Sequence, residues 1–238
     1  MYTEEKKEGG FTLLELLIVI SIIAILSVAL VLVLNPAEAL KKSRDAQRIS
    51  DVNTMKTALG LYLTSTSTPY LGGIAVNTTC KTVPSTARGA AGTFKIWYSL
   101  PTAAGTIANT ALDGSTVATP AVQSATPALT DGTGWIPVNF DTLTGGSPIS
   151  NLPVDPINAV ITASPSTDSI AAGGTLSNSS FLYRYSCAQT PLTFEIASSL
   201  ESIAYTQTDN KAANDGGNNA FYYEVGTNLR IFGSTNSF

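Results

Sequence analysis

The chain has 238 residues, which suits one domain of ordinary size with an additional element but not two full domains. Only 13% of its residues are charged, and it contains no histidine and two cysteines. Because Ser-His and Cys-His catalysis and most zinc sites need these residues, we do not expect an enzyme. The formal net charge of −4 makes the chain a poor trap for nucleic acid, and no dedicated nucleic-acid site is evident.

The first element is an apolar run from Phe11 to Leu34. It is interrupted only by four polar residues, Thr12, Glu15, Ser21 and Ser27. As an α-helix this run reaches roughly 36 Å, enough to cross the ~30 Å hydrocarbon core of a bilayer. It is longer than the apolar region of an ordinary secretory signal peptide, about 7–15 residues. We therefore predict a hydrophobic helix over residues 11–34, with a single-pass membrane anchor as the simplest interpretation.

Glu15 places an acidic side chain inside this run. Such a residue costs on the order of 2–3 kcal/mol in a membrane helix, and it usually has both a partner and a function. No basic residue lies between Phe11 and Leu34, so the partner must come from elsewhere. An α-amino group freed by proteolysis on a neighbouring copy would be a suitable cation.

The twelve residues from Gly9 to Ile20, GGFTLLELLIVI, closely resemble the class III signal of type IV prepilins and type II secretion pseudopilins. The resemblance implies that a prepilin peptidase cleaves between Gly10 and Phe11 and N-methylates Phe11. Residues 1–10 would then be a leader peptide, with the N-terminus on the cytoplasmic side. The resemblance also implies that Glu15 neutralises the amine of Phe11 on an adjacent subunit during assembly.

Residues 35–63 predict an amphipathic helix that continues into the globular part. The segment from Asn35 to Glu38 suits either a new helix start or a kinked continuous helix, and Pro36 predicts a bend in both cases. An apolar stripe follows at spacings of three and four, and we expect it to dock on the head: Ile49, Val52, Met55, Leu59 and Tyr62. Ion pairs are expected on the rest of the helix, among them Lys41–Asp45 and Arg48–Asp51. A basic stretch beside a membrane helix can instead bind lipid headgroups or nucleic acid.

The composition of residues 64–238 is rich in Thr, Ser, Gly and Pro, and it predicts a β-rich globular head. Five segments carry the aromatic and β-branched residues typical of strands: Thr93–Leu100, Gly134–Phe140, Phe181–Cys187, Thr193–Leu200 and Phe221–Phe232. Residues 189–191 are expected to form a hairpin connection, and residues from about 101 to 133 a long variable surface loop. An antiparallel sheet packed on the helix follows, which is an α+β fold. The resemblance above implies the type IV pilin fold.

A second and looser resemblance lies in the head. Three segments look similar to the heads of bacterial pilins related to the major pseudopilin: Leu152–Pro156, Tyr183–Tyr185 and Leu200–Ser202. This similarity supports the expected fold, and we carry no functional residue over on it.

Smaller features of the head suggest modifications and ligands. Cys80 and Cys187 would lie on the exported side, where a disulfide is expected, with two free thiols as the alternative. Asp209 and Asp215 lie in a loop rich in Asn and Gly, whose oxygens suit calcium, and related pseudopilins often hold calcium in a C-terminal loop. The spacing follows no strict motif, so an ordinary polar loop is favoured over a calcium site. Asn77 and Asn178 begin glycosylation sequons.

The leading hypothesis is a structural subunit of a type IV pilus, anchored in the membrane and then polymerised on the cell surface. Its expected partners are copies of itself, membrane lipid before assembly, the prepilin peptidase, and the assembly platform and motor. A pseudopilin of a type II secretion or DNA-uptake machine would share every N-terminal feature. A membrane-anchored ectodomain that never polymerises is the third interpretation.

Overall fold

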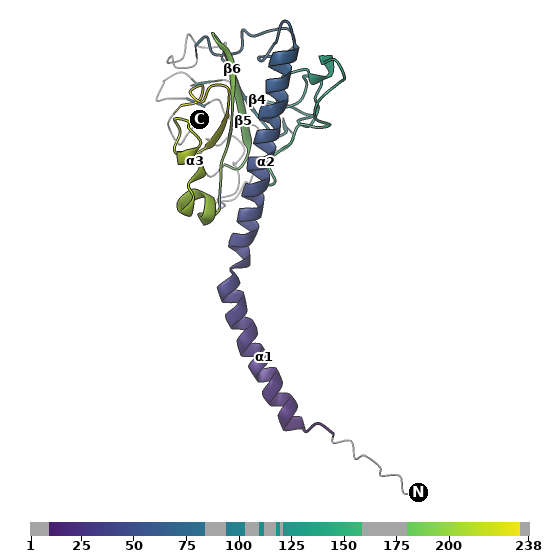
Figure 1. Ribbon diagram of the computed structural model, residues 1–238, viewed down its shortest axis with the longest axis vertical. Helices are drawn as coiled ribbons and strands as arrows, with labels where there is room; N and C mark the ends of the chain where they lie inside the picture. Colours follow the sequence, from purple (N-terminus) through teal and green to yellow (C-terminus); the bar gives the residue numbers. More distant parts are fainter. Residues whose placement is uncertain are drawn as a thin grey trace, which may run out of the picture. The chain divides into compact units, whose positions relative to one another are not determined.

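The computed structural model describes residues 10–83, 94–102, 110–111, 118–119, 121–158 and 180–233 (Figure 1). The leader residues 1–9, the sequon at Asn178 and much of the expected loop at 101–133 lie outside these ranges. The chain divides into two compact units, of which one ends at Lys41 and the other begins at Lys42. We describe each unit by itself.

The first unit contains the apolar helix α1, Leu13–Leu34. It begins two residues later than expected because Thr12 is its N-cap. All its large apolar side chains that the structure describes are exposed, from 47% for Ile18 to 82% for Leu13 and Val33. A helix that is apolar on all sides belongs in lipid or in a protein core rather than in water. By length and composition it is able to cross a membrane, as the sequence predicted.

Asn35 separates α1 from the next helix, α2, Pro36–Ser65. Its backbone is left-handed, with φ 39° and ψ 69°, a conformation that Asn tolerates better than most residues and that ends α1. The backbone N–H of Glu38 donates to the Asn35 carbonyl oxygen at 3.0 Å and to its Oδ1 at 3.4 Å. Pro36 lacks an N–H and suits the first helical position. The interpretation of Asn35 to Glu38 as a new helix start is therefore confirmed.

In the second unit, the apolar stripe of α2 packs on the sheet, as predicted (Figure 1). Val52, Met55, Leu59 and Tyr62 are buried, and Ile49 is half-buried. The four buried residues share one core with aromatic residues of the sheet and its loops, including Trp97, Trp135, Tyr183, Tyr185 and Phe194. Hydrophobic burial along a single helix face thus joins α2 to the head.

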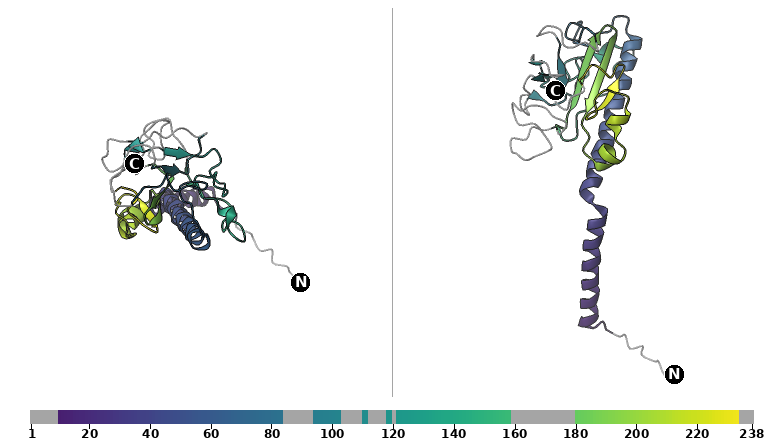
Figure 2. Two further views of the ribbon diagram at one scale, coloured as in Figure 1. Left: turned by 90° about the horizontal axis from the view of Figure 1, so that it is seen from above. Right: turned by 90° about the vertical axis from the view of Figure 1, so that its left-hand side faces the viewer.

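The main sheet has five strands in the order β4-β1-β5-β6-β7. Its long strands β5 and β6, drawn in green, lie beside α2 in the right-hand view of Figure 2. Their bounds are Ile96–Tyr98 (β1), Ala121–Gln123 (β4), Tyr183–Gln189 (β5), Leu192–Ser198 (β6) and Tyr223–Gly226 (β7). All neighbouring pairs are antiparallel except β1 and β4, which are parallel. Two further short strands, Thr110–Ala111 (β2) and Ala118–Thr119 (β3), pair separately. The α+β architecture, a long apolar helix followed by an antiparallel-rich sheet, is confirmed and is consistent with the pilin fold.

The strand assignments were partly wrong. The hairpin between β5 and β6 is confirmed, but residues 134–139 form irregular chain that leads into a short 3₁₀-helix, Phe140–Thr142 (η2). Their large apolar side chains Trp135, Ile136, Val138 and Phe140 are all buried, so their aromatic and β-branched character reflects burial rather than sheet pairing. Of Phe221–Phe232, only Tyr223–Gly226 forms a strand. Strand β4 lies within the segment expected as a loop.

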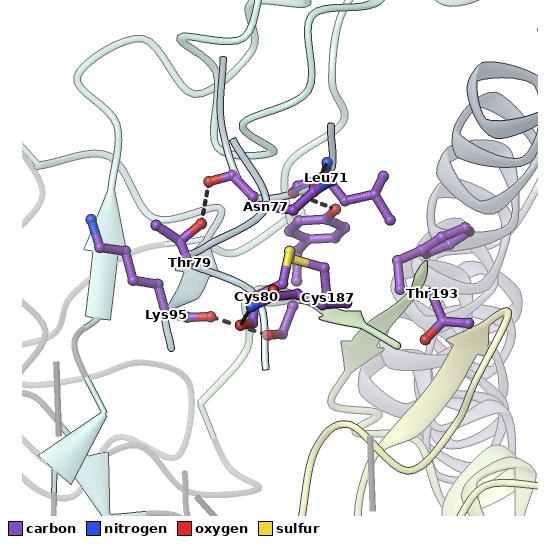
Figure 3. Close-up of a disulfide and its surroundings, with 12 residues drawn as sticks. Leu71, Asn77, Thr79, Cys80, Lys95, Cys187 and Thr193 are labelled. Atoms are coloured by element: carbon purple, nitrogen blue, oxygen red, sulfur yellow. Dashed lines mark hydrogen bonds between the residues drawn. A yellow bond between two sulfur atoms is a disulfide. The ribbon is translucent and has the colours of Figure 1, made fainter. Parts of the chain in front are cut away.

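The predicted disulfide is present. Cys80 and Cys187 are bonded, and both are buried (Figure 3). The backbone N–H of Lys81 donates to the Cys187 carbonyl at 2.8 Å, and that of Gln189 donates to the Lys81 carbonyl at 2.8 Å. The disulfide and these two hydrogen bonds attach the chain that follows α2 to β5.

A Cys80→Ser, Cys187→Ser double variant is expected to lose about 2–4 kcal/mol of unfolding free energy, because the disulfide closes a loop of 107 residues in the unfolded chain. Urea unfolding of both proteins measures the loss. Wild-type protein under reducing conditions is the control and should match the double variant. Equal midpoints for the oxidised wild type and the double variant would contradict the prediction.

Candidate functional sites: the N-terminal signal and a buried ion network

The first site is the N-terminal end of α1, where Thr12 and Glu15 form a capping box. The backbone N–H and the hydroxyl of Thr12 each donate to Glu15 Oε2 at 2.9 Å, and the backbone N–H of Glu15 donates to Thr12 Oγ1 at 3.2 Å. These bonds satisfy backbone donors that a helix start leaves open. The carboxylate of Glu15 therefore has partners within its own chain before any second copy is present.

Thr12 is a residue that sequence reasoning missed at this site. The motif Thr-x-x-Glu at the start of an apolar run is a capping-box signature and could have identified it. The proposed amine partner for Glu15, Phe11 on another copy, stays a prediction.

The peptide bond between Gly10 and Phe11 lies in non-helical chain just before α1. The Phe11 side chain is 83% exposed, and no atom lies within 4 Å of the position that a Cβ at Gly10 would take. A peptidase requires an accessible backbone that is not held in a helix, and residues 10–12 are exposed and non-helical. The expected cleavage point is thus placed where processing is sterically possible.

The second site is a buried ion network around Arg48 in α2, whose side chain is fully buried. Its Nε and Nη2 donate to the two oxygens of Asp155 at 2.7 and 3.1 Å. Its Nη1 donates to Asp45 Oδ1 at 2.8 Å and to Glu201 Oε1 at 2.7 Å. Burial acts to lower the pKa of Arg48, but the contacts with these three carboxylates raise it above its ordinary value. Arg48 is therefore a buried cation held between acids from three parts of the chain.

Further contacts extend this network along α2. Arg44 donates to both oxygens of Glu201 at 2.6 and 2.7 Å, and Asp45 accepts the backbone N–H groups of Glu201 and Ser202. The Phe181 ring lies 4.6 Å from the guanidinium carbon of Arg48. The network fastens the first turns of α2 within the head to the loop after β6 and to the segment around Asp155.

The expected surface pairs Lys41–Asp45 and Arg48–Asp51 are wrong. Asp45 and Arg48 are both buried and pair with each other, and Asp51 accepts the Tyr183 hydroxyl at 2.8 Å. The sequence carried one indication that Arg48 is buried. Arg48 and Val52 are at positions i and i+4, so Arg48 lies on the same helix face as the apolar stripe. The acidic partners Asp155 and Glu201 also lie in two of the segments that resemble pilin heads.

Asp209 and Asp215 are not gathered into a shared set of ligands. The Asp209 carboxylate pairs with Lys211 Nζ at 2.5 Å, beside the short helix α3, Lys211–Asn214. The two oxygens of Asp215 accept the backbone N–H groups of Gly217 and Glu224, each at 2.7 Å. Within the described residues, no group of three or more His, Cys, Asp or Glu side chains is arranged to hold a metal. A calcium site here stays a prediction from sequence without supporting geometry.

Asn77 uses its side chain inside its own loop. Its Oδ1 accepts the backbone N–H of Leu71 at 2.7 Å, and its Nδ2 donates to the Pro69 carbonyl at 3.1 Å. The amide at this sequon is therefore engaged in holding the loop, which disfavours its use as a glycan acceptor.

Residues 6–31 match the family model described as the prokaryotic N-terminal methylation motif. The chain carries a class III prepilin signal. The match covers Gly10, Phe11, the Thr12–Glu15 capping box and most of α1. No curated protein and no solved structure matches the chain at a significant level. This signal implies a precursor of the pilin or pseudopilin type that a prepilin peptidase processes, and α1 is long and apolar enough to anchor it in a membrane.

Proposed function

We propose that the processed chain is a structural subunit of a type IV pilus. The observation that carries this proposal is the position of α1, a helix with exposed apolar side chains that directly follows the processing site. Lipid surrounds this helix before assembly, and the helices of other copies surround it in the filament. Both environments keep the same apolar surface away from water, so the subunit moves from one to the other without exposing it.

Glu15 supplies the specific contact in this assembly. In the unassembled chain its carboxylate accepts hydrogen bonds from Thr12. Cleavage after Gly10 creates a new amine at Phe11, and a charged donor from another copy is a stronger partner for a carboxylate than a neutral one. The exchange of partners favours addition of a subunit only after the leader is removed.

The head would face the outside of the filament, and the precursor would lie in the cell membrane with its N-terminus in the cytoplasm. The low fraction of charged residues and the Thr/Ser-rich composition of the head suit the surface of a pilus. The peptidase, assembly platform and motor are separate partners in this proposal. We assign a structural rather than an enzymatic role.

Co-expression with a prepilin peptidase and an assembly machinery tests the proposal. Material sheared from the cell surface should contain filaments in electron micrographs, and mass spectrometry should find a chain that begins at N-methylated Phe11. Gly10→Val is expected to leave an uncleaved precursor in the membrane and to abolish filaments.

Gly60→Val is the matched control, because a Cβ at Gly60 also meets no atom within 4 Å. It should be processed and assembled. Filaments built from uncleaved chain would contradict the proposal. A processed chain that stays in the membrane without surface filaments would favour a secretion pseudopilin or an ectodomain instead.

A further inference from the structure

Two buried carboxyl groups, Glu195 in β6 and Glu224 in β7, lie side by side on the face of the sheet that α2 does not cover. Glu195 is opposite Gly226 in the register, and Glu224 is opposite Ala197. The two glutamates are therefore diagonal neighbours on the same face, within reach of each other's side chains. Their exposed fractions are 0% and 1%. They belong to neither the prepilin signal nor the Arg48 network.

Each glutamate has one oxygen bound by backbone N–H groups and one oxygen to which none of the described residues donates. Glu195 Oε2 accepts the backbone N–H groups of Ile231 at 2.7 Å and Phe232 at 2.9 Å. Glu224 Oε2 accepts the backbone N–H of Asn219 at 3.2 Å. The Oε1 atoms of both residues are buried and receive no hydrogen bond from the described residues. Two adjacent buried carboxylates cannot both stay ionised at low cost, but one proton shared between them satisfies both.

The surrounding backbone leaves room for this pair. A Cβ at Gly217 would lie 1.9 Å from Glu224 Oε2, and one at Gly226 would lie 2.2 Å from the Phe194 carbonyl oxygen and 3.0 Å from the Glu195 Cα. Side chains at these two positions would displace the Glu224 carboxyl or separate β7 from β6. Two glycines therefore allow the carboxyl groups to meet.

The charges around the pair differ on its two sides. The positive charge of Lys81 lowers the pKa of Glu195 and so favours its charged form. The Nζ of Lys81 donates to the Ile231 carbonyl at 3.2 Å. The negative charge of Asp215 raises the pKa of Glu224 and so favours its neutral form. The Asp215 carboxylate also accepts the backbone N–H of Glu224. Arg184 in β5 lies in the same cross-strand row as Glu224, beyond Ala197, with its guanidinium 4.3 Å from the centre of the Tyr222 ring. A cation beside Glu195 and an acid beside Glu224 place the negative charge on Glu195 and the proton on Glu224.

We propose that Glu224 is a neutral carboxylic acid that donates a hydrogen bond to the Glu195 carboxylate, and that this proton holds the C-terminal segment around Ile231 and Phe232 against β6. Loss of the proton places two negative charges side by side in the core. The segment bound to Glu195 Oε2 then separates from the sheet. The carboxyl pair therefore holds the C-terminal segment on the sheet at low pH and releases it at high pH.

The direction of the pH effect follows from the pKa values. Burial raises the pKa of Glu195 from 4.5 to about 7, and burial together with the charge of Glu195 raises the pKa of Glu224 from 4.5 to about 10. The folded head thus binds more protons than the unfolded chain above pH 4.5. The stability that the pair contributes is complete below that pH and is lost as the pH rises through about 7 and about 10.

The test uses the full chain in detergent micelles, so its outcome does not depend on pilus assembly. In wild-type protein the hydrogen-exchange protection of the Ile231 and Phe232 amides is expected to fall with rising pH. The protection falls by up to about tenfold per pH unit for each proton that is released when the segment separates from β6. Glu224→Gln keeps a neutral donor of similar shape, so its protection should lose the part of the fall between about pH 7 and about pH 10 and keep only the part that comes from Glu195. Asp141→Asn removes an exposed carboxylate outside the pair and should behave like the wild type.

Infrared spectroscopy supplies a measurement that does not depend on a variant folding well. At a pH between about 7 and about 10, wild-type protein should show the carbonyl band of a buried protonated carboxyl group, and Glu224→Gln should lack it. The proposal is overturned if that band is absent from the wild type, or if Glu224→Gln retains the pH dependence of the wild type. Calcium that raises the melting midpoint of the wild type but not of Glu224→Gln would also overturn it, by placing a metal ion where we place the proton.

Discussion

A Glu15→Gln chain is expected to be cleaved and to insert in the membrane but to form no filaments. Gln is accepted at the third position of a capping box, so the start of α1 is preserved. The negative charge is lost, and the amine of Phe11 on a neighbouring copy would then enter an apolar filament core without a counter-ion. A charge-assisted hydrogen bond is worth about 1.5–3 kcal/mol. Each subunit addition is therefore weakened by roughly ten- to a hundredfold, and the loss is repeated at every subunit.

Electron microscopy of sheared material and the mass of the processed chain measure the two parts of this prediction. Thr12→Ala is the matched control, because it removes the hydroxyl that donates to Glu15 but keeps the backbone donor and the charge. It should lose about 1 kcal/mol of helix-start stability and still form filaments. Abundant filaments from Glu15→Gln would show that pairing with the amine does not drive assembly.

Arg48→Met is expected to lower the unfolding free energy of the head by about 3–5 kcal/mol, the usual result of removing one partner from a buried ion pair. Methionine fills part of the volume but leaves Asp45, Asp155 and Glu201 without their shared cation. The carboxylates of Asp45 and Asp155 are fully buried. Urea unfolding followed by tryptophan fluorescence measures the loss, because Trp97 and Trp135 both lie in the core that α2 shares.

Arg44→Met is the comparison for this variant. Its side chain is 33% exposed and donates to the outer partner of the network, Glu201, which would keep its contact with Arg48. A loss of about 1 kcal/mol or less is expected there. Acidification should partly restore Arg48→Met relative to the wild type, because protonation removes the charge of the unpaired carboxylates. Equal losses in the two variants would contradict the role of Arg48 as the centre of the network.

The N-terminal features could be predicted because each depends on residues close in sequence. The extent of α1, its membrane-spanning length, the prepilin signal at its start and a bend near Pro36 follow from an apolar run, a short motif and a proline. The core face of α2 was also predictable, since a stripe at spacings of three and four needs a partner surface of any kind. Local patterns of this sort do not require knowledge of the partner.

The assignment of residues 134–140 failed for a different reason. Aromatic and β-branched residues mark both strands and buried irregular chain, and only the packing around Trp135 and Phe140 decides between them. The parallel pairing of β4 with β1 likewise depends on the path of the intervening chain, which leaves no periodic signal in three residues.

The sequence by itself determined that this protein is a prepilin-type precursor, because Gly10, Phe11, Glu15 and the apolar helix after them lie within one short segment. Only the tertiary structure decided where its charges lie. Arg48 meets Asp155 across 107 positions of the sequence, and Glu195 meets Glu224 across a pair of strands. Spacing along one helix predicted solvent-exposed pairs for the first, and nothing local indicated the second. The energy of a charge depends on its burial and its partners, and these are set by how distant segments pack together.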